Sequence, residues 1–188
     1  MRTPIVLCLA LAAIACEAGP PAPAEGTAAA PPFRTTVSIE EIMRYMIDPP
    51  ADAIWESVVT IVTEDGVEEI MPETDEDWEA LRKQAVTLTE ATNLLLMEDR
   101  RVAEEGSTSE LPGVDLEPEQ IEALLAENRG AWTQFTLGLH DSGVAVLDAI
   151  DAHDLDGLLV AGDGLDLACE NCHVRFWYPD LGTQGSAN

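Results

Sequence analysis

Positive charge is scarce in this chain. Its 188 residues include nine Lys and Arg against 36 Asp and Glu, and the formal net charge is −27 at pH 7. A field of this sign repels the phosphate backbone of nucleic acids, so nucleic-acid binding is excluded. The largest basic clusters are the pairs Arg82-Lys83 and Arg100-Arg101, which are too small to dock the chain on anionic lipid headgroups.

The sequence patterns of several enzyme classes are also missing. There is no glycine-rich phosphate loop and no arrangement typical of an activated nucleophile, and the carboxylates are dispersed along the chain. No segment of useful length alternates polar and apolar residues, the pattern typical of a β-strand. Hydrophobic residues make up 46 % of the chain. We therefore expect one helical domain with a real core and no enzyme activity.

A long apolar run occurs at the N-terminus, where residues 5–15 follow Arg2, but it is too short for a permanent membrane span. It ends in Ala13-Ile14-Ala15-Cys16, which resembles the lipobox of bacterial lipoproteins, with Ala13 where Leu is more usual. We predict a signal peptide over residues 1–16, with lipid attached at Cys16. A plain signal peptide cut after Ala22-Pro23-Ala24 is the alternative. Both place the mature protein in the periplasm, and the first anchors it to a membrane.

The composition then divides the chain into a linker, a folded domain and a tail. Residues 17–36 form a linker rich in Ala and Pro, residues 37–180 fold, and residues 181–188 are a C-terminal tail. Ser38 and Glu41 have the spacing of a capping box, which starts a helix. Asp48-Pro49-Pro50 predicts that this first helix is broken or kinked there, because proline lacks a backbone donor; the helical pattern resumes beyond it as far as Ile61.

Apolar residues at steps of three and four predict further helices over about 74–102, 118–151 and 155–176. Thr74 with Asp77 marks the start of the first of these helices, and Pro118 occupies a first-turn position in the second. Four amphipathic segments joined by connections of modest length predict an all-α fold. We expect an antiparallel four-helix bundle whose first helix is broken at Pro49-Pro50.

The last predicted helix contains Cys169-Glu170-Asn171-Cys172-His173, a C-x-x-C-H sequence. In an exported protein this is the attachment signature of haem c. On a helix, Cys169, Cys172 and His173 project from one face, because they are three and four residues apart. The two thiols can be alkylated by the vinyl groups of one haem, while the imidazole of His173 binds the iron as its proximal ligand.

Other sites built from a pair of cysteines fit this pattern less well. A structural zinc site needs four ligands, and only His140 and His153 remain as distant candidates. A thioredoxin-like pair lies early in a strand–helix unit, whereas this pair lies near the C-terminus of a helical pattern. A plain disulfide explains neither the histidine nor the spacing.

An exported helical bundle with C-x-x-C-H on its last helix resembles the class II c-type cytochromes, the cytochrome c prime family. The likeness covers about residues 38–180 and is sharpest at residues 168–173. It implies one covalent haem c, a distal face lined by the first helix, and electron transfer as the function; haem-based binding or sensing of NO or CO through an open distal site is the alternative. Members of this family often pair through their first two helices, so a homodimer is implied too. The chain departs from the family at Asp48-Pro49-Pro50 and in a long loop at Leu111-Pro112-Gly113.

The resemblance also implies a sixth ligand to the iron. Low-spin members supply a Met from the first helix, and Met43 lies at the matching place, with Met46 as the second choice; core filler is the alternative role for both. Arg175 is a candidate partner for a haem propionate, or else a solvated arginine at a helix end. The negative charge predicts a redox partner protein with a basic docking face. We expect the core or the haem to take up the four tryptophans, Trp55, Trp78, Trp132 and Trp177.

Overall fold

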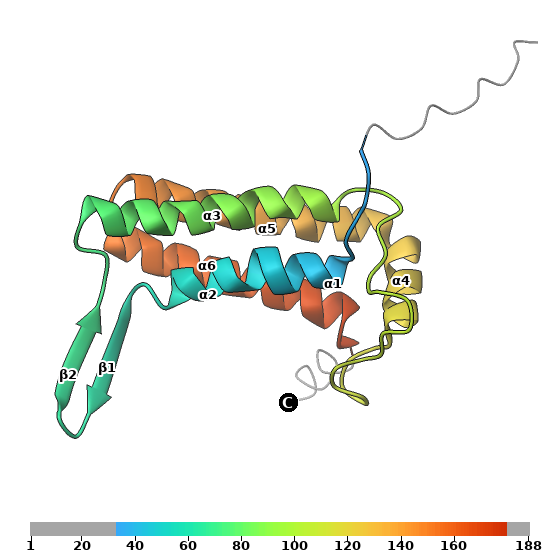
Figure 1. Cartoon of the computed structure of the whole chain (residues 1–188), viewed down its shortest axis with the longest axis horizontal. Coiled ribbons are helices and arrows are strands. Elements are labelled where there is room, and N and C mark those ends of the chain that lie inside the picture. Colours follow the sequence, from blue (N-terminus) through green and yellow to red (C-terminus); the bar gives the residue numbers. More distant parts are fainter. Residues whose placement is uncertain (1–32, 180–188) are drawn as a thin grey trace, which may run out of the picture. The chain divides into compact units, whose positions relative to one another are not determined.

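A computed structural model describes residues 33–179 of the chain (Figure 1). The predicted signal peptide with Cys16, the linker up to residue 32 and the C-terminal tail lie outside the described residues. No helix within 33–179 has both the length and the apolar character that a membrane span requires.

The described part is mostly helical, as predicted, and also contains one small antiparallel sheet. The elements in chain order are α1 (Ile39–Ile42), the π-helix η1 (Met43–Ile47), α2 (Asp48–Trp55), β1 (Val59–Thr63), β2 (Gly66–Ile70), α3 (Asp75–Leu95), α4 (Pro118–Glu127), α5 (Arg129–Asp151) and α6 (Leu155–Phe176). Helix α5 packs against both α3 and α6, while the segment α1–η1–α2 lies along α3 and α2 also contacts α6 (Figure 1). The apolar faces of these helices enclose the core.

The first helical segment begins where the sequence predicts it. Ser38 and Glu41 form the expected capping box, with the Glu41 N–H donating to Ser38 Oγ at 3.1 Å. The expected break at Pro49-Pro50 is different in kind, because helical winding continues through both prolines. The interruption comes one turn earlier, as the π turn of η1, in which the Asp48 N–H donates to the carbonyl of Met43. With this wider turn the helix continues although Pro49 and Pro50 have no backbone N–H to donate.

The prediction of continued helix up to Ile61 is wrong, as is the expectation that no strand occurs. Residues 59–63 pair with residues 66–70 in a hairpin whose turn is Glu64-Asp65. All five residues of β1 are β-branched, so the segment suits a strand better than a helix. The Asp65-Gly66 pair that follows is a hairpin signal.

Two helix boundaries also differ from the prediction. Helix α3 ends at Leu95, seven residues early, because the carbonyls of Arg101 and Val102 instead accept from the first N–H groups of α1, those of Ile39 and Glu40, each at 2.9 Å. The single helix expected over 118–151 is divided at Asn128, where φ is −120° and ψ is 34°. The Asn128 side chain donates to the Leu124 carbonyl at 2.8 Å and so competes with the helical backbone.

Candidate functional site

Helix α6 presents the two cysteines and the histidine of the C-x-x-C-H sequence on one face, as predicted. The helix is capped at its start by Asp154, whose side chain accepts from the Gly157 N–H at 3.0 Å. Its last turn is held in the core by Phe176, which is fully buried and packs edge-on against the rings of Trp132 and Phe135. The thiols of Cys169 and Cys172 are not joined in a disulfide, and Cys172 is buried.

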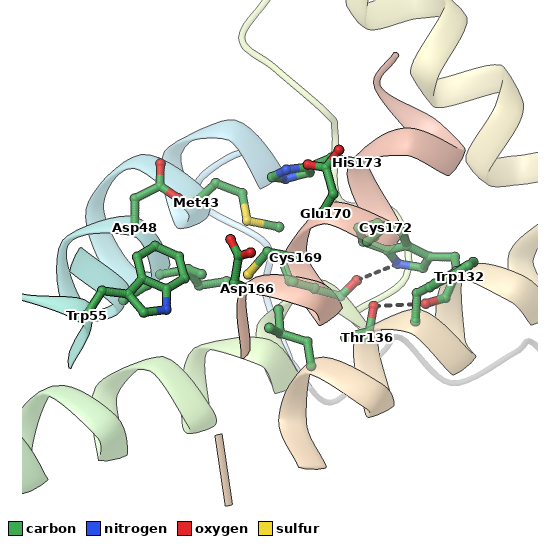
Figure 2. Close-up of a pocket in the computed structure, with 15 residues that line it drawn as sticks. Met43, Asp48, Trp55, Trp132, Thr136, Asp166, Cys169, Glu170, Cys172 and His173 are labelled. Carbon is green, nitrogen blue, oxygen red and sulfur yellow. Dashed lines mark hydrogen bonds between the residues drawn. The ribbon is translucent and has the colours of Figure 1, made fainter. Parts of the chain in front are cut away.

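A cavity of about 180 Å³ lies in front of this face, between α6 and the first helical segment (Figure 2). Cys169, Cys172 and His173 border it from α6, and Met43 reaches it from η1. Most of the remaining wall is apolar or aromatic and comes from η1, α2, α3 and α5: Ile47, Ala51, Trp55, Leu95, Trp132, Phe135 and Leu139. The structure therefore brings the predicted thiols, imidazole and thioether together at one apolar space, although Met43 lies more than 120 residues before the motif in sequence.

The two candidate methionines have different surroundings. Met43 lines the cavity, whereas Met46 is partly buried against the core and lines no cavity that includes His173. In the π turn the Asp48 N–H donates to the carbonyl of Met43, five residues earlier, and both residues line the first cavity. Figure 2 shows the Met43 side chain lying between Asp48 and His173.

A second cavity, of about 310 Å³, shares Met43, Asp48 and His173 with the first. Its other wall is the long loop before α4, which Leu116 ties to the end of α6 by donating its N–H to the Trp177 carbonyl at 2.8 Å. The same loop carries Glu110, which forms an ion pair with Arg44. This loop thus covers one side of the candidate site.

Two arginines, Arg175 and Arg44, differ in their position relative to the two cavities. Arg175 lines neither cavity; its guanidinium donates to Asn128 Oδ1 at 2.7 Å and lies 5.1 Å from the centre of the Phe176 ring. Arg44 lines the second cavity and is the one Arg or Lys among the described residues that border the two. Sequence reasoning missed Arg44, because its approach to α6 depends on the packing of η1 and not on the motif.

Burial and nearby acids set the ionisation of the site. Burial raises the pKa of both Cys169 and Cys172 to about 12, and Asp48 and Asp166 add to the effect at Cys169. Both thiols are therefore protonated at neutral pH. Burial lowers the pKa of His173, while the neighbouring carboxylates of Asp48 and Glu170 oppose that fall. The imidazole is thus available in the neutral form that binds a metal.

The tryptophans divide between the site and the rest of the core. Trp55 and Trp132 border the first cavity and Trp177 borders the second. The indole N–H of Trp132 donates to the Leu95 carbonyl at 3.1 Å, and that of Trp55 to the Gly162 carbonyl at the same distance. Trp78 borders neither cavity and stacks on His153 instead, with ring centres 4.8 Å apart.

The side chains present fit a covalently attached haem in their chemistry. Two thiols and an imidazole share one helix face, a thioether comes from another helix, and the wall between them is apolar. An empty apolar cavity of about 150 Å³ accommodates benzene, so a porphyrin needs the first cavity and the adjoining second one together. Within residues 33–179 no group of three His, Cys, Asp or Glu side chains is arranged to hold a bare metal ion. Comparisons with known protein families, with curated proteins and with solved structures found no match for this chain.

Proposed function

We propose that this protein carries one haem c, bound covalently through Cys169 and Cys172, and that it transfers electrons in the periplasm. The observation that carries this proposal is the meeting of both thiols, His173 and Met43 at one apolar cavity. When bound, the haem supplies a one-electron couple at its iron. The chain holds this group in place and shields it from water. In this proposal the protein is an electron carrier and not an enzyme.

The residues around the cavity would have different roles in binding the haem. Cys169 and Cys172 would fix it to α6 through two thioether bonds, and His173 would bind the iron on the proximal side. Met43 would bind on the opposite side, from η1. Trp55, Trp132 and Leu139 exclude water, which limits the solvent reorganisation that accompanies electron transfer. We assign Arg44, which borders the second cavity, as the cation that would neutralise a propionate, in preference to Arg175, which borders neither cavity.

For the fold we propose an antiparallel four-helix bundle related to the class II c-type cytochromes. Its four members would be the segment α1–η1–α2, then α3, α5 and α6. Three observations support this assignment: the packing of α5 against α3 and α6, the packing of the first segment against α3, and the place of C-x-x-C-H on the final helix. The hairpin and the short helix α4 are additions to that plan.

We further propose that the chain is exported and tethered to the membrane by lipid on Cys16. The Ala- and Pro-rich linker would then separate the anchor from the folded domain. Replacing Cys16 by Ser should release the protein from the membrane fraction, as followed by fractionation and immunoblotting. A mature N-terminus downstream of Cys16 in the wild type would rule the anchor out.

Mass spectrometry of the exported full chain tests the haem directly. The mature wild type should carry the mass of one haem that survives acid denaturation, and the variant C169A/C172A should lack it. Asn171→Ala is the matched control, because Asn171 lies between the cysteines, is exposed and borders neither site cavity; it should keep the haem. Extraction of the haem into acidified organic solvent, or unchanged attachment in C169A/C172A, would contradict the proposal.

A further inference from the structure

We propose that strand β1 pairs edge to edge with β1 of a second copy of this chain, giving a four-stranded antiparallel sheet across a two-fold axis. The hairpin extends away from the helices (Figure 1), and neither of its strands packs extensively against any of them. Every residue of β2 and all but Val59 of β1 are exposed. A lone two-stranded hairpin is only marginally stable in water, so this one lacks the third strand or helix that a hairpin ordinarily needs.

The distribution of charge selects β1 as the edge at which two copies of the chain can meet. Strand β1 reads Val-Thr-Ile-Val-Thr, with no charge and no proline, whereas β2 carries Glu68 and Glu69 and the turn carries Glu64 and Asp65. Natural proteins protect edge strands with charges, prolines or bulges, and β1 has none of these. Two copies that each carry a net charge of −27 repel one another over most of their surfaces. The β1 edge is a place where they can meet without opposing carboxylates.

The register of the hairpin fixes the register of the dimer. Thr63 pairs with Gly66 across the two-residue turn, so this pair is hydrogen-bonded, and alternation makes Ile61 and Glu68 a hydrogen-bonded pair too. The backbone groups of Thr60 and Val62 then point to the free edge of β1. Two copies use these groups fully when Ile61 faces Ile61 of the second copy, because Thr60 of each then pairs with Val62 of the other. The interface is symmetric, as a two-fold axis requires.

The same register places two Ile61 residues in a pair without direct hydrogen bonds, whose Cα atoms are about 4.5 Å apart. This separation is within the range that a disulfide spans. The full-length variant Ile61→Cys, exported to an oxidising compartment, should therefore form disulfide-linked dimers on a non-reducing gel. The matched control is Glu68→Cys, which lies opposite Ile61 on the same face but on the other strand, and it should stay monomeric. The disulfide also traps the transient association expected of so small an interface.

A second pair of variants tests the register itself. Val59 should face Thr63 of the second copy, so Val59→Cys alone should not cross-link, but its mixture with Thr63→Cys should. Peptide mapping must identify the bond as one between two copies of residue 61. Monomeric Ile61→Cys, equal cross-linking of Glu68→Cys, or a bond from residue 61 to a different protein would each overturn the proposal. None of these readouts depends on a bound haem.

Discussion

At the scale of single residues, Met43 and Met46 lie within one turn of each other on η1, yet only Met43 borders the cavity in front of His173. The proposed sixth ligand is thus tied to one side chain. The wild type should be low spin, with a weak methionine-to-iron band in the far red of its absorption spectrum. Met43→Ala should become high spin and bind CO, because the position opposite His173 would then be open.

Met46→Ala is the matched control for that experiment, since Met46 packs against the core and lines neither cavity of the site. It should keep the low-spin spectrum. A wild type that is already high spin and takes up CO would contradict ligation by Met43 and would favour the binding of NO or CO as the function. Loss of the far-red band in Met46→Ala alone would move the ligand to Met46 and keep the electron carrier.

The two arginines allow a second comparison of neighbouring residues. Arg44 borders the second cavity, and removing its positive charge should stabilise the oxidised form of the iron centre. Arg44→Gln should therefore lower the midpoint potential in a redox titration. Arg175→Gln should change the potential less, because Arg175 borders neither cavity of the site. A larger shift in Arg175→Gln would support the propionate contact that the sequence motif indicates.

At the scale of the elements, the packing of α5 against α3 depends on Gly143. A Cβ at this position would clash with Thr89 Oγ1 and lie 3.2 Å from Thr89 Cβ, and Thr89 is itself buried and donates to the Ala85 carbonyl. Gly143→Ala should destabilise the fold by about 1–3 kcal/mol, as overpacking does. The measurement is the midpoint of chemical denaturation.

Gly138 lies in the same helix α5, but a Cβ there would meet nothing within 4 Å. Gly138→Ala should therefore stabilise the protein by about 0.5–1 kcal/mol, the usual gain when alanine replaces glycine in a helix. Equal effects of the two substitutions would show that the approach of α3 and α5 is looser than the structure has it.

Local signals predicted the starts of the elements better than their ends. The capping boxes at Ser38 and Thr74 and the proline at residue 118 mark helix starts, and each has its cause within four residues. The end of α3 depends on where α1 lies, and the division at Asn128 involves an arginine 47 residues away. The hairpin could have been predicted, because its β-branched run and its Asp65-Gly66 pair are local signals in the sequence.

In the candidate site, too, local features could be predicted from the sequence and features that depend on packing could not. The face formed by Cys169, Cys172 and His173 comes from helical spacing alone, so the motif predicted it. The approach of Met43 and Arg44 depends on a π turn, and no residue type signals such a turn in advance. Thr136 and Leu139 border the cavity through the crossing of α5 and α6, which periodicity does not determine.

At the scale of the whole molecule, the net charge of −27 should govern how fast a partner is met. A redox partner with a basic face would be attracted over long distances, and salt would screen that attraction. The bimolecular rate of electron transfer, measured by stopped flow, should therefore fall between low and physiological salt. A rate independent of salt would leave the acidity as a feature of solubility alone.

The π turn at residues 43–47 contains one residue more than an α-helix uses over the same path. In evolutionary terms, such a turn is what a single inserted codon leaves behind in a helix that absorbs it without a loop. Deleting one residue here would restore uniform winding and rotate all of α1 by about 100° relative to α2. Met43 would leave the cavity while Ile54 kept its place in the core. One codon therefore changes which side chains of the first helical segment face α6.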